Sequence, residues 1–184
     1  MDNFEIEASR CVRCALSLTR TRVVVGSGSY DAALVVVGEA PGRSEDEQGL
    51  PFIGRSGQLL FQLIGEETGL TREDCYVTSV VKCRPPNNRT PKRNEIDACA
   101  PWWVEQRERV CAAVILTLGN TATRAVLASS QTIGALHGVA VTLGTATVVP
   151  TYHPAAALRG VPNVEAMIRS DLRVVAQLLK ETTP

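Results

Sequence analysis

The sequence lacks an excess of charge of either sign, any low-complexity tract and any apolar run long enough to cross a bilayer. Basic and acidic residues number 19 each among 184, so the formal net charge is zero. Proteins that coat DNA normally carry a large positive excess, which disfavours broad electrostatic binding but allows a small, locally basic footprint. A membrane helix needs ~20 apolar residues. The acidic start MDNFEIEASRC has no signal-peptide core, and we therefore expect a cytoplasmic protein.

The composition is that of a soluble globular protein, with 45% hydrophobic and 21% charged residues. A chain of this length can bury one core of ordinary size. Neither an internal repeat nor an interdomain linker is visible, so we expect a single domain over residues 1–184.

Short apolar runs alternate with amphipathic segments along the chain. This alternation predicts an α/β fold, a three-layer α/β/α sandwich around a mainly parallel, four-stranded central sheet. Residues 139–147 are expected to form a hairpin around Leu143-Gly144. The predicted strands are 34–38, 76–81, 112–118 and 147–151, and the predicted helices are 57–69, 93–109, 120–128 and 163–180.

The loops that carry polar and glycine-rich sequence each follow a predicted strand. They begin after Gly38, Lys82, Gly119 and His153. In open α/β sheets the ligand sites gather at the carboxyl ends of the strands, so we expect these four loops to form one site.

Four of the six cysteines have the spacing of metal ligands. Cys11 and Cys14 form a CxxC pair, whereas Cys83 and Cys99 flank a proline-rich loop. Such a set suits either tetrahedral zinc or a [4Fe–4S] cluster, and half of a zinc ribbon or buried thiols are the alternatives. Cys75 and Cys111 stand at the starts of apolar strands, where we expect small buried hydrophobes.

The loop after Gly38 is glycine-rich but matches neither a dinucleotide-binding nor a P-loop motif. It adds the acids Glu39, Glu45 and Asp46 and the aromatic Phe52. A solvated turn is the alternative for the acids, and core packing is the alternative for Phe52.

Three segments, GEAPGRSEDEQGLPFIGRSG, VVKCRPPNNRTP and YHPAAALR, resemble the signature segments of the family 4 uracil-DNA glycosylases. The resemblance runs from Cys11 to about Arg159 and implies a uracil-DNA glycosylase-like fold. It also implies a [4Fe–4S] cluster rather than zinc, tying the N-terminal segment to the 83–99 loop through Cys11, Cys14, Cys83 and Cys99.

The resemblance implies a DNA-repair enzyme that hydrolyses the N-glycosidic bond of a flipped-out uracil. Phe52 is then the residue that stacks on the base, and the backbone of Glu39 and Ala40 contacts its edge. His153 is the donor to the base oxygen, where negative charge develops. The other histidine, His137, is expected in a turn or at the surface.

The resemblance also assigns residues to the water and to DNA. Glu45 and Asn88 match positions that hold the water, with Glu39 as a neighbouring acid. No lysine suits a Schiff base, so we expect a monofunctional, monomeric enzyme that leaves an abasic site. DNA is expected to meet helix-start amides and a wedge led by Leu158, using Gly54, Ser56, Gly57, Asn120, Leu158 and Arg159. The basic residues Arg84, Arg89, Lys92 and Arg93 form either a DNA contact or an ordinary solvated loop.

Ser79 departs from the family, which has an asparagine there to pair with uracil. A hydroxyl offers no fixed amide pair, so we expect reduced selectivity or rate. The substitution also allows a glycosylase for hypoxanthine, xanthine or another deaminated base. A non-catalytic damaged-DNA-binding protein and a small iron–sulfur electron carrier are rival hypotheses. The retained Glu45, Asn88 and His153 disfavour the first, and the HPAAALR and GEAPG loops disfavour the second.

Overall fold

The structure is a computed structural model that describes residues 3–182. Its centre is a five-stranded sheet in the order β2-β1-β3-β5-β4. The first four strands in this order are parallel, and β4 pairs antiparallel with β5. The strands are β1 (Leu34–Gly38), β2 (Cys75–Ser79), β3 (Val114–Leu118), β4 (Val141–Leu143) and β5 (Ala146–Thr151).

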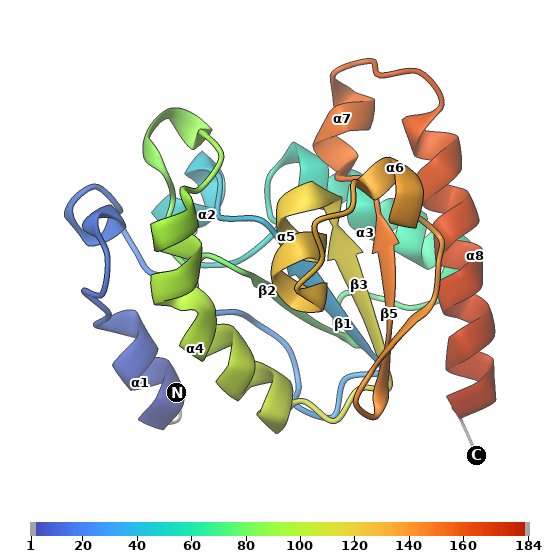
Figure 1. Ribbon diagram of the computed structural model, residues 1–184, viewed down its shortest axis with the longest axis horizontal. Coiled ribbons are helices and arrows are strands. Elements are labelled where there is room, and N and C mark those ends of the chain that lie inside the picture. The colour runs from blue at the N-terminus through green and yellow to red at the C-terminus, as the bar shows by residue number, and fades with distance from the viewer. Residues whose placement is uncertain (1–2, 183–184) are drawn as a thin grey trace.

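Helices cover both faces of the sheet (Figure 1). On one face, α3 (Arg55–Thr68) and α8 (Val164–Thr182) pack on Leu34, Val36 and Leu116. On the other, α4 (Arg93–Arg109) and α5 (Gly119–Leu127) pack on Val35, Val37 and Ile115. The shorter helices are α1 (Asn3–Ser9), η1 (Ala15–Leu18), α2 (Arg43–Gln48), η2 (Pro86–Asn88), α6 (Ile133–Leu136) and α7 (Pro154–Leu158).

The predicted three-layer α/β sandwich is confirmed, with two corrections. The sheet has five strands instead of four, because the hairpin strand β4 joins its edge. The third strand begins at Val114, two residues later than predicted, so Cys111 lies outside the strand and is exposed. Cys75 is buried as expected, and its Sγ donates to the carbonyl of Thr71 at 3.4 Å.

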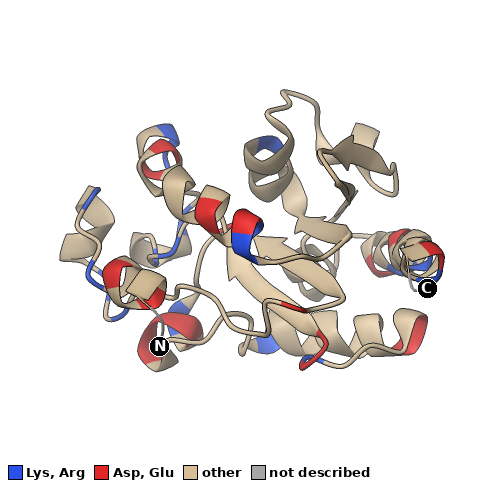
Figure 2. Cartoon of the chain, turned by 90° about the horizontal axis from the view of Figure 1, so that it is seen from below, with Lys and Arg blue, Asp and Glu red and all other residues tan. Residues whose placement is uncertain are grey.

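Charged side chains are confined to helices and loops. The five strands contain none, and they appear entirely tan in Figure 2. Over residues 3–182, no helix is both long enough and apolar enough to cross a membrane.

The strand register brings the predicted loops to one edge. Gly38 pairs with Ser79 at the carboxyl ends of β1 and β2, and Leu118 pairs with Thr151 at the ends of β3 and β5. The segments that follow these four residues therefore surround a common space, as the sequence predicts.

Candidate active site and cysteine site

A cavity of about 740 Å³ opens at the carboxyl edge of the sheet. Its size falls within the range of small-molecule sites in proteins. Gly54, Gly57 and Leu158 do not line it, although Leu158 is exposed. The predicted site residues that do line it are Glu39, Ala40, Glu45, Phe52, Ser56, Ser79, Asn88, Asn120, His153 and Arg159.

Phe52 is fixed in place by its neighbours. Its side chain is 8% exposed, and its backbone has the left-handed φ of 53°, a conformation that a bulky residue adopts only under constraint. Arg72 donates to the carbonyls of Phe52 and Pro51. A Cβ on Gly38 would lie 2.4 Å from the ring, and one on Gly57 would lie 1.9 Å from the Phe52 carbonyl. Only glycine fits at both positions, so the ring is held against the end of β1.

Glu45 is a buried carboxylate that organises the same loop. Its Oε1 accepts from the amides of Ile53 at 3.0 Å and Gly54 at 2.8 Å. The Gly54 amide is thereby occupied, and Gly57 is buried against Phe52. The first finding corrects the expectation that Gly54 offers its amide to a phosphate, the expectation for the Gly57 amide stays a prediction, and Ser56 does line the cavity.

His153 caps α7, and its Nδ1 accepts from the amide of Ala155 at 3.1 Å. Burial lowers the pKa of His153 to about 4, with the positive charge of Arg159 acting in the same direction. The ring is therefore neutral at pH 7. Since Nδ1 is an acceptor, Nε2 carries the proton and is the donor. The ring faces Phe52, with 6.0 Å between centroids.

Ser79 lies at the floor of the cavity and is 4% exposed. In contact with Ser79 is Lys82, which is 1% exposed and lines the cysteine hollow but not this cavity. The Lys82 ammonium donates to the Ser79 carbonyl, to Thr78 Oγ1 at 2.8 Å and to Gln106 Oε1 at 2.6 Å. Its burial lowers the pKa of Lys82 to about 8. The position of this lysine directly after Val80-Val81 was the available sign of its burial.

Two asparagines stand at the rim. Asn88 is exposed with a φ of 54°, and its Oδ1 accepts from Arg84 Nε at 2.7 Å. Asn120 Oδ1 accepts from the Ile133 amide at 2.8 Å. His137 lies elsewhere: its Nδ1 is 3.1 Å from a carboxylate oxygen of Asp171. His137 therefore contacts α8 through Asp171 and does not line the cavity.

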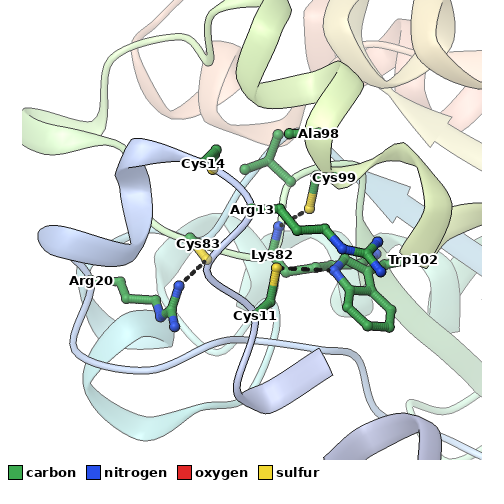
Figure 3. A pocket seen from close by; sticks show the side chains of 10 residues that line it. Cys11, Arg13, Cys14, Arg20, Lys82, Cys83, Ala98, Cys99 and Trp102 are labelled. Carbon is green, nitrogen blue, oxygen red and sulfur yellow. Dashed lines mark hydrogen bonds between the residues drawn. The ribbon is translucent and has the colours of Figure 1, made fainter. Parts of the chain in front are cut away.

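The four predicted ligand cysteines line a single small hollow between the N-terminal segment and α4 (Figure 3). Three of their sulfur atoms accept N–H hydrogen bonds. Trp102 Nε1 donates to Cys11 at 3.2 Å, Arg20 to Cys83 at 3.4 Å and the Lys82 amide to Cys99 at 3.3 Å. Such donors stabilise negative charge on sulfur, so this set of groups suits metal-bound thiolates. Within residues 3–182, no three His, Cys, Asp or Glu side chains are arranged to hold one metal ion.

The basic loop after Cys83 is partly neutralised by carboxylates. Arg89 pairs with Glu95 at 2.6 Å, and Arg93 pairs with Asp97 at 2.8 Å. Arg84 and Lys92 have no ion pair among the described residues. The positive charge of this loop is therefore smaller than its sequence indicates.

Comparison with known proteins identifies relatives over nearly the whole chain. Residues 25–173 match the family model of the uracil DNA glycosylase superfamily. The type-4 uracil-DNA glycosylase of Thermotoga maritima is 41% identical over 94% of this chain and 91% of its own length. That of Saccharolobus solfataricus is 40% identical over 97% of this chain and 88% of its own. That of Archaeoglobus fulgidus is 36% identical over 100% of this chain and 96% of its own.

Proposed function

The chain belongs to the uracil DNA glycosylase superfamily, with type-4 relatives, and from this premise we propose how its cavity excises uracil. The protein is a DNA glycosylase, a hydrolase of base-excision repair that acts on uracil in DNA. The observation that carries the proposal is the neutral ring of His153. It lines the cavity opposite Phe52, and its Nε2–H is free to donate a hydrogen bond to a base because Nδ1 accepts from Ala155.

Recognition begins with extrusion of the base from the duplex, which costs a few kcal/mol. The extruded base stacks on Phe52, whose ring is fixed by Gly38 and Arg72. The backbone of Glu39 and Ala40 contacts the edge of the base, and the Ser79 hydroxyl lies on the cavity floor. Leu158, exposed at the end of α7, fills the gap left in the duplex, and Arg159, Ser56 and Asn120 contact the strand.

Hydrolysis breaks the bond between sugar C1′ and the base nitrogen and forms a bond between C1′ and a water oxygen. The electron pair of the broken bond leaves with the base, and His153 Nε2–H donates to the base oxygen that becomes negative. A neutral imidazole suits this role because it donates without giving up its proton. Glu45 has one carboxylate oxygen engaged by two amides, and its Oε2 together with Asn88 holds the water. The proton released by the water leaves through this carboxylate to solvent.

The cysteine site is proposed to hold a [4Fe–4S] cluster through Cys11, Cys14, Cys83 and Cys99. The four cysteine side chains line one hollow, and the N–H donors to three of their sulfur atoms suit the negative charge of a cluster. When bound, the cluster cross-links residues 11–14 to the loop 83–99. Its role is structural, and the chain works as a single domain and as a monomer, on DNA in the cytoplasm.

The experiment uses an oligonucleotide with one uracil, beside hypoxanthine and xanthine versions, followed by alkaline cleavage of abasic sites. Strand scission at uracil that is lost in His153→Ala supports the proposal. Scission without alkali would contradict monofunctional chemistry. Absence of scission with tight retention of the damaged strand would instead show a binding protein.

A second candidate, excision of other deaminated bases, rests on the buried Ser79 at the cavity floor. A hydroxyl can donate or accept, so it discriminates less between ring edges than an asparagine amide. Ser79→Asn is expected to raise preference for uracil over cytosine about tenfold, within the ~1–3 kcal/mol of one well-placed bidentate contact. Equal selectivity in both proteins would show that Ser79 does not read the base.

A further inference from the structure

The segment from Arg10 to Arg22, here called the N-terminal arm, concentrates positive charge in a neutral protein. Residues 8–30 contain four arginines and no acid, which leaves 15 basic against 19 acidic residues elsewhere. Within residues 3–182, no ion pair involves any of these arginines. The loop 84–93, by contrast, has two of its four cations neutralised. The four arginines of residues 8–30 are Arg10, Arg13, Arg20 and Arg22.

The arm is fastened to the rest of the molecule along its length. Arg13 lies over the Trp102 ring at 4.2 Å, and Arg20 donates to Cys83 Sγ. The amides of Thr21 and Arg22 donate to Asp46 Oδ1 at 2.9 and 3.3 Å. Asp46 thus binds the backbone of the arm, and its carboxylate forms no ion pair with an arginine side chain among the described residues.

The arm ends beside the candidate active site. Asp46 directly follows Glu45, which lines the cavity. Val24, two residues after Arg22, lines the cavity as well, and its amide donates to the Lys82 carbonyl at 2.8 Å. A polyanion that delivers a base to this cavity therefore passes close to the arm. Arg10, Arg13 and Arg22 are exposed to meet it.

We propose that the N-terminal arm binds the phosphate backbone of DNA next to the flipped nucleotide, with Arg13 and Arg22 as its principal contacts. This inference rests on the proposed function for the identity of the polyanion. It gives the cysteine site a task in binding: Cys11 and Cys14 hold the arm against the 83–99 loop, so that phosphate contacts are made by a fixed surface. Preorganised contacts of this kind lose less conformational freedom on binding.

The test measures how the Kd for a uracil-containing duplex depends on salt. Each phosphate contact contributes about 0.9 to the slope of log Kd against log salt concentration. The double variant Arg13→Gln/Arg22→Gln is expected to lower this slope by about 2, and Arg22→Gln, which leaves Trp102 and the cysteines untouched, by about 1. The matched control, Arg107→Gln/Lys180→Gln, removes two exposed charges outside the arm and is expected to keep the wild-type slope.

Iron content and visible absorption, measured for every variant, show whether the cysteine site is intact. The loss of binding is expected to raise KM for duplex DNA more than it lowers kcat. An unchanged slope in Arg22→Gln, or an equal fall in the control, would overturn the inference. A wild-type protein that releases no uracil would overturn the proposed function alone, because the salt slope is measured by binding and not by cleavage.

Discussion

The base cavity and the cysteine site are built by different means. The cavity is formed by loops that leave neighbouring strand ends, and short contacts such as Glu45 to the Ile53 and Gly54 amides hold its parts. At the cysteine site, single hydrogen bonds to sulfur connect distant segments, from Trp102 to Cys11 and from Arg20 to Cys83.

The difference indicates a division of labour. The cavity is organised by the polypeptide itself, since Phe52, Glu45 and His153 each have their position fixed by protein groups. For the N-terminal arm, which single protein contacts hold, we propose an added cross-link through the cysteines, because ordering a long irregular segment costs about 1–2 kcal/mol per residue in backbone entropy. Changes in the cavity should therefore affect chemistry, and changes at the cysteines should affect stability and DNA binding.

The largest expected effect is on chemistry in His153→Ala. Removing a donor aimed at developing charge lowers kcat about 10²–10³-fold, measured as uracil release under single-turnover conditions. His137→Gln, which alters the other histidine at Asp171, serves as the control and is expected to retain kcat within a few fold. A comparable loss of kcat in His137→Gln would contradict the assignment of the donor.

The second-largest expected effect is on stability, when the proposed cross-link at the cysteines is lost. Cys83→Ala is expected to lower the free energy of unfolding by about 3 kcal/mol, by analogy with the loss of a native covalent cross-link. Chemical denaturation with matched iron analysis measures this effect. Cys111→Ala is the control, since Cys111 is an exposed cysteine outside the site. Equal stability of the two variants would show that no cross-link is made at Cys83.

A smaller effect, on kcat/KM, is expected at Gly38, where the backbone of β1 closely approaches the Phe52 ring. Gly38→Ala places a Cβ 2.4 Å from the Phe52 ring and is expected to lower kcat/KM about tenfold by displacing the stacking residue. In Gly65→Ala the new Cβ has its nearest atom at 3.7 Å, the Leu70 carbonyl, so this helix variant should keep wild-type activity. If Gly38→Ala is as active as Gly65→Ala, the ring position does not matter.

The smallest expected effect is the change in the rate of uracil release with pH. Burial holds the pKa of His153 at about 4, so the donor stays neutral and its part in uracil release should change less than about twofold between pH 5 and 8. An acid limb near the ordinary histidine pKa of ~6.5 would contradict this.

His153 also makes the free energy of unfolding depend on pH. Between pH 6.5 and 4 the unfolded chain binds a proton at His153 that the folded chain does not, so its contribution lowers stability as the pH falls through this range. His153→Gln is expected to remove this part of the pH dependence, measured by denaturant midpoints.

The sequence predicted the parts of the fold that depend on local patterns. Apolar runs such as Leu34–Gly38 located the strands, and their carboxyl ends located the cavity. The sequence did not predict contacts between segments that lie far apart along the chain. The Gly54 amide was expected to face a phosphate, but the buried Glu45 accepts from it. The partners of Lys82 include Gln106 on α4, which no spacing rule brings to the segment after β2. Cys111 was expected to be buried at the start of an apolar strand, but the strand begins only at Val114 and Cys111 is exposed.

The most direct test of the division of labour compares two quantities in the Cys83→Ala protein: the Kd for a uracil-containing duplex and the single-turnover rate of uracil release at saturating DNA. We predict that the Kd rises at least about tenfold and that the slope of log Kd against log salt concentration falls by up to about 2, because the arm loses its proposed cross-link. The rate should stay within about threefold of the wild-type value, since the cavity is held by its own hydrogen bonds. A rate that falls as far as the affinity, with folding intact, would contradict this account and make the cysteine site part of the catalytic machinery.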